Sequence, residues 1–140
     1  MSLKTIGPVR GRIDVQALST ARTMVAEDTG TTFVLAAAGK AVIIPAADLK
    51  NRGVWYRFVC GADVTGAVWS FTSAGTSDMH VHISSGAGDD VDVITTGTKV
   101  DLVQFVHTVA LEGDMVEMYS TGVFWMVTGH TVVVEGVTTS

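Results

Sequence analysis

Cysteine is nearly absent from the chain, and this absence restricts its chemistry. Cys60 is the only cysteine among 140 residues, so an internal disulfide and a multi-cysteine zinc site are both excluded. It lies in the apolar stretch 54–60, which predicts a buried and unreactive thiol.

Basic residues are also few, with nine lysines and arginines against 14 aspartates and glutamates and a formal net charge of -5. Because phosphate binding needs a basic face, we do not expect nucleic acid as a partner. The charge is uneven: Lys4, Arg10 and Arg12 against Asp14 give residues 1–16 a net charge of +2, which leaves -7 for the remainder. A basic arm on an acidic body can dock on an acidic partner, and an ordinary solvated tail is the alternative.

Long apolar runs and long helical patterns are both missing. No run could span a bilayer, and the start of the chain lacks the charged region and apolar block of a signal peptide. We therefore expect synthesis in a cytoplasm and no membrane partner. Residues 46–52 are the one stretch that fits a helical turn, so elimination predicts an all-β chain.

Glycine, valine and threonine are abundant instead, a composition that favours short strands joined by tight turns. The hydrophobic fraction of 47% argues against disorder, and 140 residues suffice for one domain. The clearest local pattern lies at residues 113–129. Apolar and polar side chains alternate there on both sides of a turn at residues 120–122, which predicts a β-hairpin.

Similar short strands are predicted along the rest of the chain. They cover residues 19–25, 32–36, 40–45, 54–60, 67–71, 79–83, 91–94, 99–111 and 131–134, with turns at 27–30 and 95–98 and a loop at 84–90. About ten strands predict an antiparallel β-sandwich, a jelly roll or a β-barrel. We divide the chain into an extended N-terminal arm, residues 1–18, with room for one short strand, and a single β domain, residues 19–140.

Two groups of residues have the donor types of a metal site. His80 and His82 share one face of a strand, and Asp78 or one of the carboxylates Asp89, Asp90 and Asp92 could add a ligand. The solvent side of a half-buried strand explains the histidines, and a solvated acidic turn explains the carboxylates. Because no other feature supports a metal, none is predicted, nor is any other cofactor.

Catalytic motifs are absent as well. The chain has no Gly-x-Ser-x-Gly turn, no cysteine–histidine signature and no glycine-rich phosphate loop that opens a helix. The sequence therefore gives no support for an enzyme.

The three tryptophans fall into two groups. Trp69 and Trp125 lie on apolar strand faces and are predicted to be core residues. Trp55 lies beside Arg57 on the polar face of its strand and is the best candidate for an exposed aromatic residue. Contact with a protein partner is favoured over stacking on a sugar.

The order of several motifs is informative. An acidic turn and an apolar strand at 26–35 come first, and a strand that ends in Ile44-Pro45 follows. A glycine and an aromatic strand come next, at 53–59. Gly113-Asp114 then opens the hairpin, which continues through Ser120, Gly122, Trp125 and Gly129. This order resembles a small all-β module of structural proteins in tailed-phage virions, in which Leu-Pro stands in place of Ile44-Pro45. The resemblance covers about residues 20–129 and excludes the arm.

The resemblance implies a structural role. A stand-alone chain with an arm and no fibre repeats is most similar to a capsid decoration, or cement, protein: a small β knob, often a trimer, on the outer surface of the assembled head that stabilises contacts between major capsid subunits. With the charge split, it implies an arm that contacts the capsid through Lys4, Ile6, Val9, Arg10, Arg12 and Ile13. The alternative is a tail-fibre or baseplate module that binds a host receptor or glycan, with Trp55 as the anchor and Arg57 beside it.

Overall fold

The computed structural model describes residues 12–75, 78–86, 92–133 and 135–140, and within residues 92–99 it describes the backbone alone. The strands are β1 Asp14–Leu18, β2 Arg22–Thr23, β3 Thr31–Leu35, β4 Ala41–Ile44, β5 Trp55–Cys60, β6 Trp69–Ser73, β7 Met79–Ser85, β8 Asp92–Val100, β9 Leu102–Phe105, β10 Met115–Ser120, β11 Trp125–Thr131 and β12 Val137–Thr139. Two short 3₁₀ helices, η2 Ala26–Asp28 and η3 Leu49–Asn51, lie between strands. The predicted helical turn at 46–52 therefore contains η3, and the all-β prediction is confirmed.

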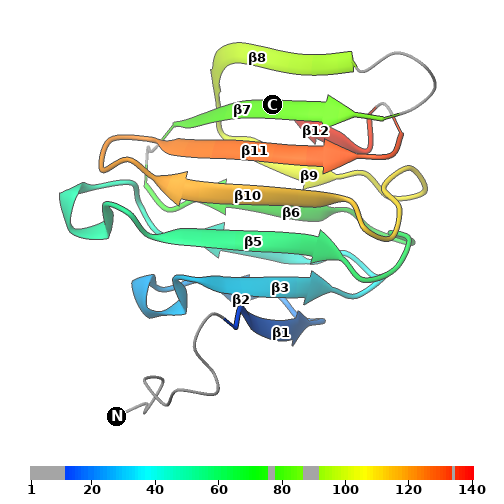
Figure 1. Ribbon diagram of the computed structural model, residues 1–140, viewed down its shortest axis with the longest axis horizontal. Helices are drawn as coiled ribbons and strands as arrows, with labels where there is room; N and C mark the ends of the chain where they lie inside the picture. Colours follow the sequence, from blue (N-terminus) through cyan, green and yellow to red (C-terminus); the bar gives the residue numbers. More distant parts are fainter. Residues whose placement is uncertain (1–11, 76–77, 87–91, 134) are drawn as a thin grey trace.

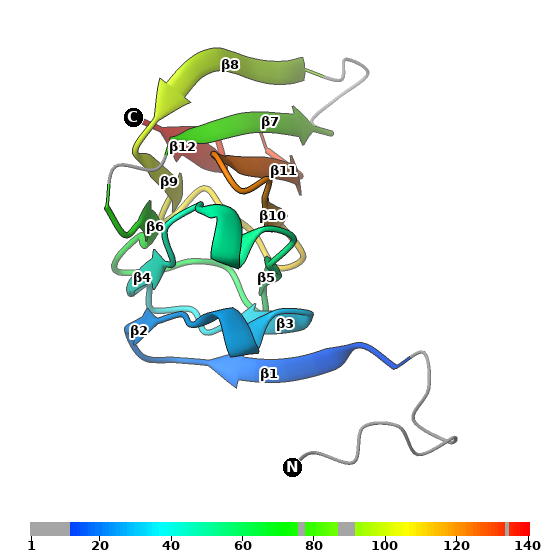
Figure 2. The same cartoon turned by 90° about the vertical axis from the view of Figure 1, so that its left-hand side faces the viewer.

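The strands form two sheets that pack face to face (Figures 1 and 2). The seven-stranded sheet has the order β1-β3-β5-β10-β11-β7-β8, and the five-stranded sheet has the order β12-β9-β6-β4-β2. Each sheet ends in two edge strands, so the fold is a sandwich and the predicted alternative of a closed barrel is wrong.

The chain winds back and forth between the sheets at its start. Strands β1, β3 and β5 belong to the seven-stranded sheet, and β2, β4 and β6 belong to the other. Two reversals separate neighbours in the same sheet, so β1, β3 and β5 run parallel, as do β2, β4 and β6. Strand β11 is also parallel to β7. The predicted sandwich is therefore confirmed, but its strand pairing is mixed, because these parallel pairs lie beside antiparallel pairs such as β5–β10.

The core fills the space between the sheets. In β5 the side chains of Tyr56, Phe58 and Cys60 are buried, whereas the intervening ones are half-buried on the outer face. Phe58 meets Phe71 of the other sheet with ring centroids 4.6 Å apart. Aromatic contact of this kind adds to the burial of apolar area. Trp125 is fully buried, as predicted.

The predicted hairpin at 113–129 is confirmed. Strands β10 and β11 pair in an antiparallel register in which Tyr119 faces Met126. The Thr121 amide donates to the Phe124 carbonyl at 3.0 Å, which closes the turn. Gly122 has a φ of +94°, a conformation that strongly favours glycine.

The start and end of the chain differ from the prediction. The predicted strand 19–25 is reduced to the two residues of β2, and the longer strand β1 lies in the predicted arm, which allowed for one strand. Residues 14–18 therefore belong to the sandwich. The predicted strand 131–134 is wrong: Thr131 is the last residue of β11, and the last strand is β12.

The region between β7 and β10 also differs. Strand β7 continues through Ser85 into the predicted loop 84–90, and β8 runs through the predicted turn at 95–98. The predicted strand 99–111 is divided near Asp101, whose amide donates to the Ser140 carbonyl at 2.9 Å. Strand β9 then ends at Phe105, because the chain turns at Thr108, which has a φ of +66°.

Candidate functional site

The predicted capsid-contact arm is described only in its last part. Lys4, Ile6, Val9 and Arg10 lie outside the described residues. Arg12 is exposed, and Ile13 is 55% exposed directly before β1. The described part of the arm thus places an exposed basic residue and an exposed apolar residue directly before β1.

Strands β1 and β2 lie together at one end of the sandwich (Figures 1 and 2), which we call the β1–β2 end. Each is an edge strand of its sheet, with β3 or β4 on one side and no described strand on the other. Val15 of β1 is 57% exposed, and Val25, after β2, is 49% exposed. Unpaired backbone groups beside exposed apolar side chains provide a template for another strand.

A salt bridge closes the core at this end. Arg22 Nη2 lies 2.8 Å from Asp28 Oδ1, and the guanidinium lies over the Phe33 ring at 5.1 Å. The Tyr56 hydroxyl donates to the Val25 carbonyl at 2.6 Å. Burial, with the nearby Asp28 carboxylate, raises the pKa of Tyr56, so the phenol keeps its proton. The salt bridge and this hydrogen bond therefore order the surface of the β1–β2 end and cover the core beneath it.

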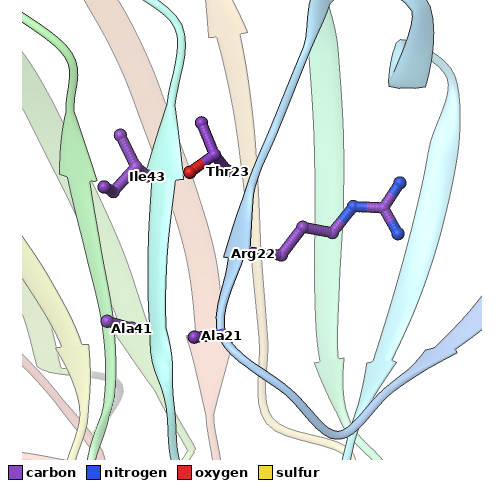
Figure 3. A pocket seen from close by; sticks show the side chains of 5 residues that line it. All are labelled: Ala21, Arg22, Thr23, Ala41 and Ile43. Atoms are coloured by element: carbon purple, nitrogen blue, oxygen red, sulfur yellow. The ribbon is translucent and has the colours of Figure 1, made fainter.

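A shallow hollow of about 190 Å³ lies beside this end, on the outer face of the five-stranded sheet. It is lined by Ala21, Arg22, Thr23, Ala41 and Ile43 (Figure 3). The Arg22 side chain extends away from Thr23 and Ile43, toward its partner Asp28. The hollow thus presents small apolar groups and a threonine hydroxyl, without an acid–base pair.

The predicted partner contacts Trp55 and Arg57 lie on the outer face of the seven-stranded sheet. Both are half-buried, and the guanidinium lies 5.8 Å from the centroid of the Trp55 ring. Arg57 also donates to Glu117 Oε2 from Nε at 3.0 Å and from Nη2 at 2.7 Å. The sequence analysis missed Glu117 as a partner, because the pairing of β5 with β10 joins residues distant in the chain.

The histidine pair has surroundings typical of a solvent-facing strand. His82 is exposed, and His80 packs on Phe124 with ring centroids 4.4 Å apart. Asp89 and Asp90 lie outside the described residues, and so does the side chain of Asp92. In the part of the chain that is described, no three His, Cys, Asp or Glu side chains are close enough to hold a metal ion.

Ser84 and His130 form a serine–histidine contact that sequence reasoning did not identify. The Ser84 hydroxyl contacts His130 Nδ1 and also donates to the Gly129 carbonyl at 3.4 Å. The donor and acceptor roles in the Ser84–His130 contact depend on the imidazole tautomer, so the contact alone does not make Ser84 an activated nucleophile. The contact lies on a strand face, and among the described side chains His130 has no carboxylate partner that would orient its ring. It therefore has the arrangement of a surface hydrogen bond.

The Cys60 thiol is buried, as predicted. Burial and the Asp114 and Asp63 carboxylates raise its pKa from 9.0 to about 12. The unfolded chain loses this proton at lower pH, so the free energy of unfolding falls as pH rises from about 9 toward 12. At pH 8 we expect a thiolate-selective reagent to modify the native protein at least about 100-fold more slowly than the unfolded protein. Similar rates in the two states would contradict the burial of this thiol.

Comparison with known proteins finds no matching family model, no similar curated protein and no similar solved structure. Among the described residues, no helix is long and apolar enough to cross a membrane. Function must therefore be inferred from the surfaces of the sandwich itself.

Proposed function

We propose that this chain is a structural protein of a tailed-phage virion, a decoration protein that binds the outer surface of the assembled head. Its role is to stabilise contacts between neighbouring major capsid subunits. The observation that carries the proposal is the β1–β2 end. There, the basic arm ends in exposed Ile13 and leads directly into the edge strand β1, in which Val15 is exposed.

The proposed mechanism is strand addition. A capsid strand pairs with β1, and its side chains cover Ile13 and Val15. Main-chain hydrogen bonds supply affinity in such contacts, and side-chain pockets supply specificity. Pairing also removes the aggregation risk of an open edge.

The charge distribution supports the same mechanism, and we propose that copy number adds to it. The basic arm, with Lys4, Arg10 and Arg12, is attracted to an acidic shell, although the body of the chain is acidic. A homo-oligomer, for which we favour a trimer, presents several β1–β2 ends at once. Weak contacts then combine, and binding to the assembled shell alone stabilises the shell by mass action.

Co-sedimentation with empty heads of the cognate phage tests this proposal. The full chain is compared with a version that lacks residues 1–13, which keeps β1 and its buried Leu18. We expect saturable binding by the full chain, a large loss without residues 1–13, and no binding to unassembled capsid subunits. If neither version sediments with the heads, the proposal is wrong.

A single substitution tests the edge itself. Val15→Glu places a charge on β1, at a side chain that is 57% exposed. We expect an affinity for heads at least about 10-fold lower, because the carboxylate would be desolvated on strand addition. The free energy of unfolding should change by about 0.5 kcal/mol or less, as is usual at the surface.

Val132→Glu is the matched control. Val132 is 51% exposed and lies in the loop after β11, and its replacement changes the net charge equally. It should bind heads like the unchanged protein. Equal losses for the two variants would indicate a general charge effect and would contradict docking at β1.

A further inference from the structure

A row of aromatic and apolar side chains crosses the outer face of the seven-stranded sheet. The strand registers place Tyr119 of β10 opposite Trp55 of β5, Met126 of β11 opposite Tyr119, and His80 of β7 opposite Met126. Phe124 extends the row by packing on His80. We call these five residues the aromatic row. Strands lie about 4.8 Å apart, so the row is about 14 Å long between Trp55 and His80.

Rings of the row are accessible, and Trp55 has contacts that hold it in place. Tyr119 is 44% exposed, and Trp55 is half-buried. The Trp55 amide donates to Thr29 Oγ1 at 3.0 Å, and the Arg57 guanidinium lies against the ring. A ring that is fixed before binding loses little conformational entropy when a ligand arrives.

A polar row runs beside the aromatic row, two residues away on each strand: after it in β5, β11 and β7 and before it in the antiparallel β10. Its members, in order across the sheet, are Arg57, Glu117, Thr128 and His82. Two residues of a strand rise about 7 Å, so hydrogen-bonding groups flank the rings at the distance of one ligand unit. Thr128 and His82 are exposed and face each other in the register.

The charges on this face cancel. Arg57 and Glu117 are the charged residues that point outward among the described side chains of β3, β5, β10, β11 and β7, and they pair with each other. Both of their hydrogen bonds end on Glu117 Oε2. The pair thus presents polar atoms without a net charge that would attract an ionic ligand.

We propose that the aromatic row and the polar row together bind a neutral saccharide chain. A pyranose ring has an apolar C–H face, which packs on the electron-rich faces of Trp55 and Tyr119, and a rim of hydroxyls that can bond to Arg57, Glu117 and His82. This activity goes beyond shell binding and uses a different surface, because β1 lies at the edge of the sheet and the rows cross its middle strands.

The arrangement fits a saccharide better than a protein partner. A protein interface that covered the aromatic row would also cover the adjoining Arg57–Glu117 pair, and desolvation of an ion pair is costly. A stable protein interface also buries about 800 Å² of surface on each side, far more than a single row of side chains offers. The hydroxyls of a saccharide instead replace the water molecules on the polar row and form equivalent hydrogen bonds.

The test uses the full-length protein and an array of immobilised neutral saccharides that contain glucose, mannose, galactose or N-acetylglucosamine, with polysialic acid and heparin as charged comparisons. Saccharides that bind are then titrated in solution by tryptophan fluorescence. Trp69 and Trp125 are fully buried, so a ligand-dependent change reports on Trp55. We expect saturable binding to a neutral saccharide. For Trp55→Ala and Tyr119→Ala, calorimetry should measure an affinity about 10- to 100-fold lower.

Ile43→Ala is the control, because Ile43 is 40% exposed on the outer face of the other sheet. It should bind like the unchanged protein, and Tyr119→Phe should retain most of the affinity because it keeps the ring. Circular dichroism establishes that each variant is folded. Binding to no neutral saccharide, binding to the charged polymers alone, or unchanged affinity in folded Trp55→Ala and Tyr119→Ala would each overturn the proposal.

Discussion

Replacement of Asp114 by alanine is expected to lower the free energy of unfolding by about 3 kcal/mol. The Asp114 side chain is 1% exposed and accepts two backbone hydrogen bonds, from Leu111 at 2.9 Å and from Val132 at 2.8 Å. It thereby joins the loop before β10 to the loop after β11. Alanine leaves both amides without this acceptor, and hydrogen bonds to a charged group contribute about 1.5–3 kcal/mol each.

Urea unfolding of Asp114→Ala, Asp114→Asn and Asp63→Ala measures this effect. Asp114→Asn keeps one carbonyl acceptor, so we expect about half of the loss. Asp63→Ala is the matched control: its carboxylate also accepts a backbone hydrogen bond, from Glu112 at 2.9 Å, but it is exposed. The control should lose about 1 kcal/mol or less. A loss as small as this in Asp114→Ala would show that the buried carboxylate does not hold the loops together.

Replacement of Trp125 by alanine is expected to lower the free energy of unfolding by about 3–5 kcal/mol. Trp125 is fully buried, and its ring stacks on Tyr56 with centroids 5.9 Å apart. Its indole N–H donates to the Pro45 carbonyl at 2.9 Å. Pro45 follows β4 of the other sheet, so the same side chain fills the core and links the two sheets.

Trp125→Phe separates these contributions. Phenylalanine keeps most of the ring contact but loses the N–H, so we expect it to regain more than half of the stability lost in Trp125→Ala. Trp55→Ala is the control for tryptophan removal, because Trp55 lies half-buried on the outer face. It should cost about 1 kcal/mol. If Trp55→Ala destabilised the protein as much as Trp125→Ala, the assignment of core and surface faces would be wrong.

The strands that the sequence predicted well are those with one face in the core. In β5, β10 and β11, buried side chains alternate with half-buried or exposed ones, and this alternation is visible in the sequence. It also identified Trp69 and Trp125 as core residues. Strand β1 has no such pattern, because four of its five residues are exposed and Leu18 alone is buried. Its assignment depends on pairing with β3, which is a long-range contact.

The parallel winding could not be predicted from local patterns. Period-two alternation is the same in parallel and antiparallel strands, so it does not fix the pairing. The number of residues between paired positions also varies. Asp14 pairs with Thr31, and Thr31 in turn pairs with Tyr56, so the sequence shows no regular repeat. A close approach at Gly39 is equally hidden: a side chain there would overlap the Val68 backbone.

The candidate surfaces were predicted in part. Alternation within β5 placed Trp55 and Arg57 together on an outer face, which the structure confirms. Their neighbours Glu117 and Tyr119 lie on β10, and the sequence did not predict that β10 pairs with β5. Four of the six predicted arm contacts lie outside the described residues, so those positions stay a prediction.

Electron cryo-microscopy of empty heads incubated with the protein tests the central claim most directly. The proposal predicts knobs at regular positions on the outer shell, each with its β1–β2 end against the capsid and β1 continued by a capsid strand. The aromatic row should then remain accessible. Bare heads, or knobs attached through another face with β1 unpaired, would contradict the proposal.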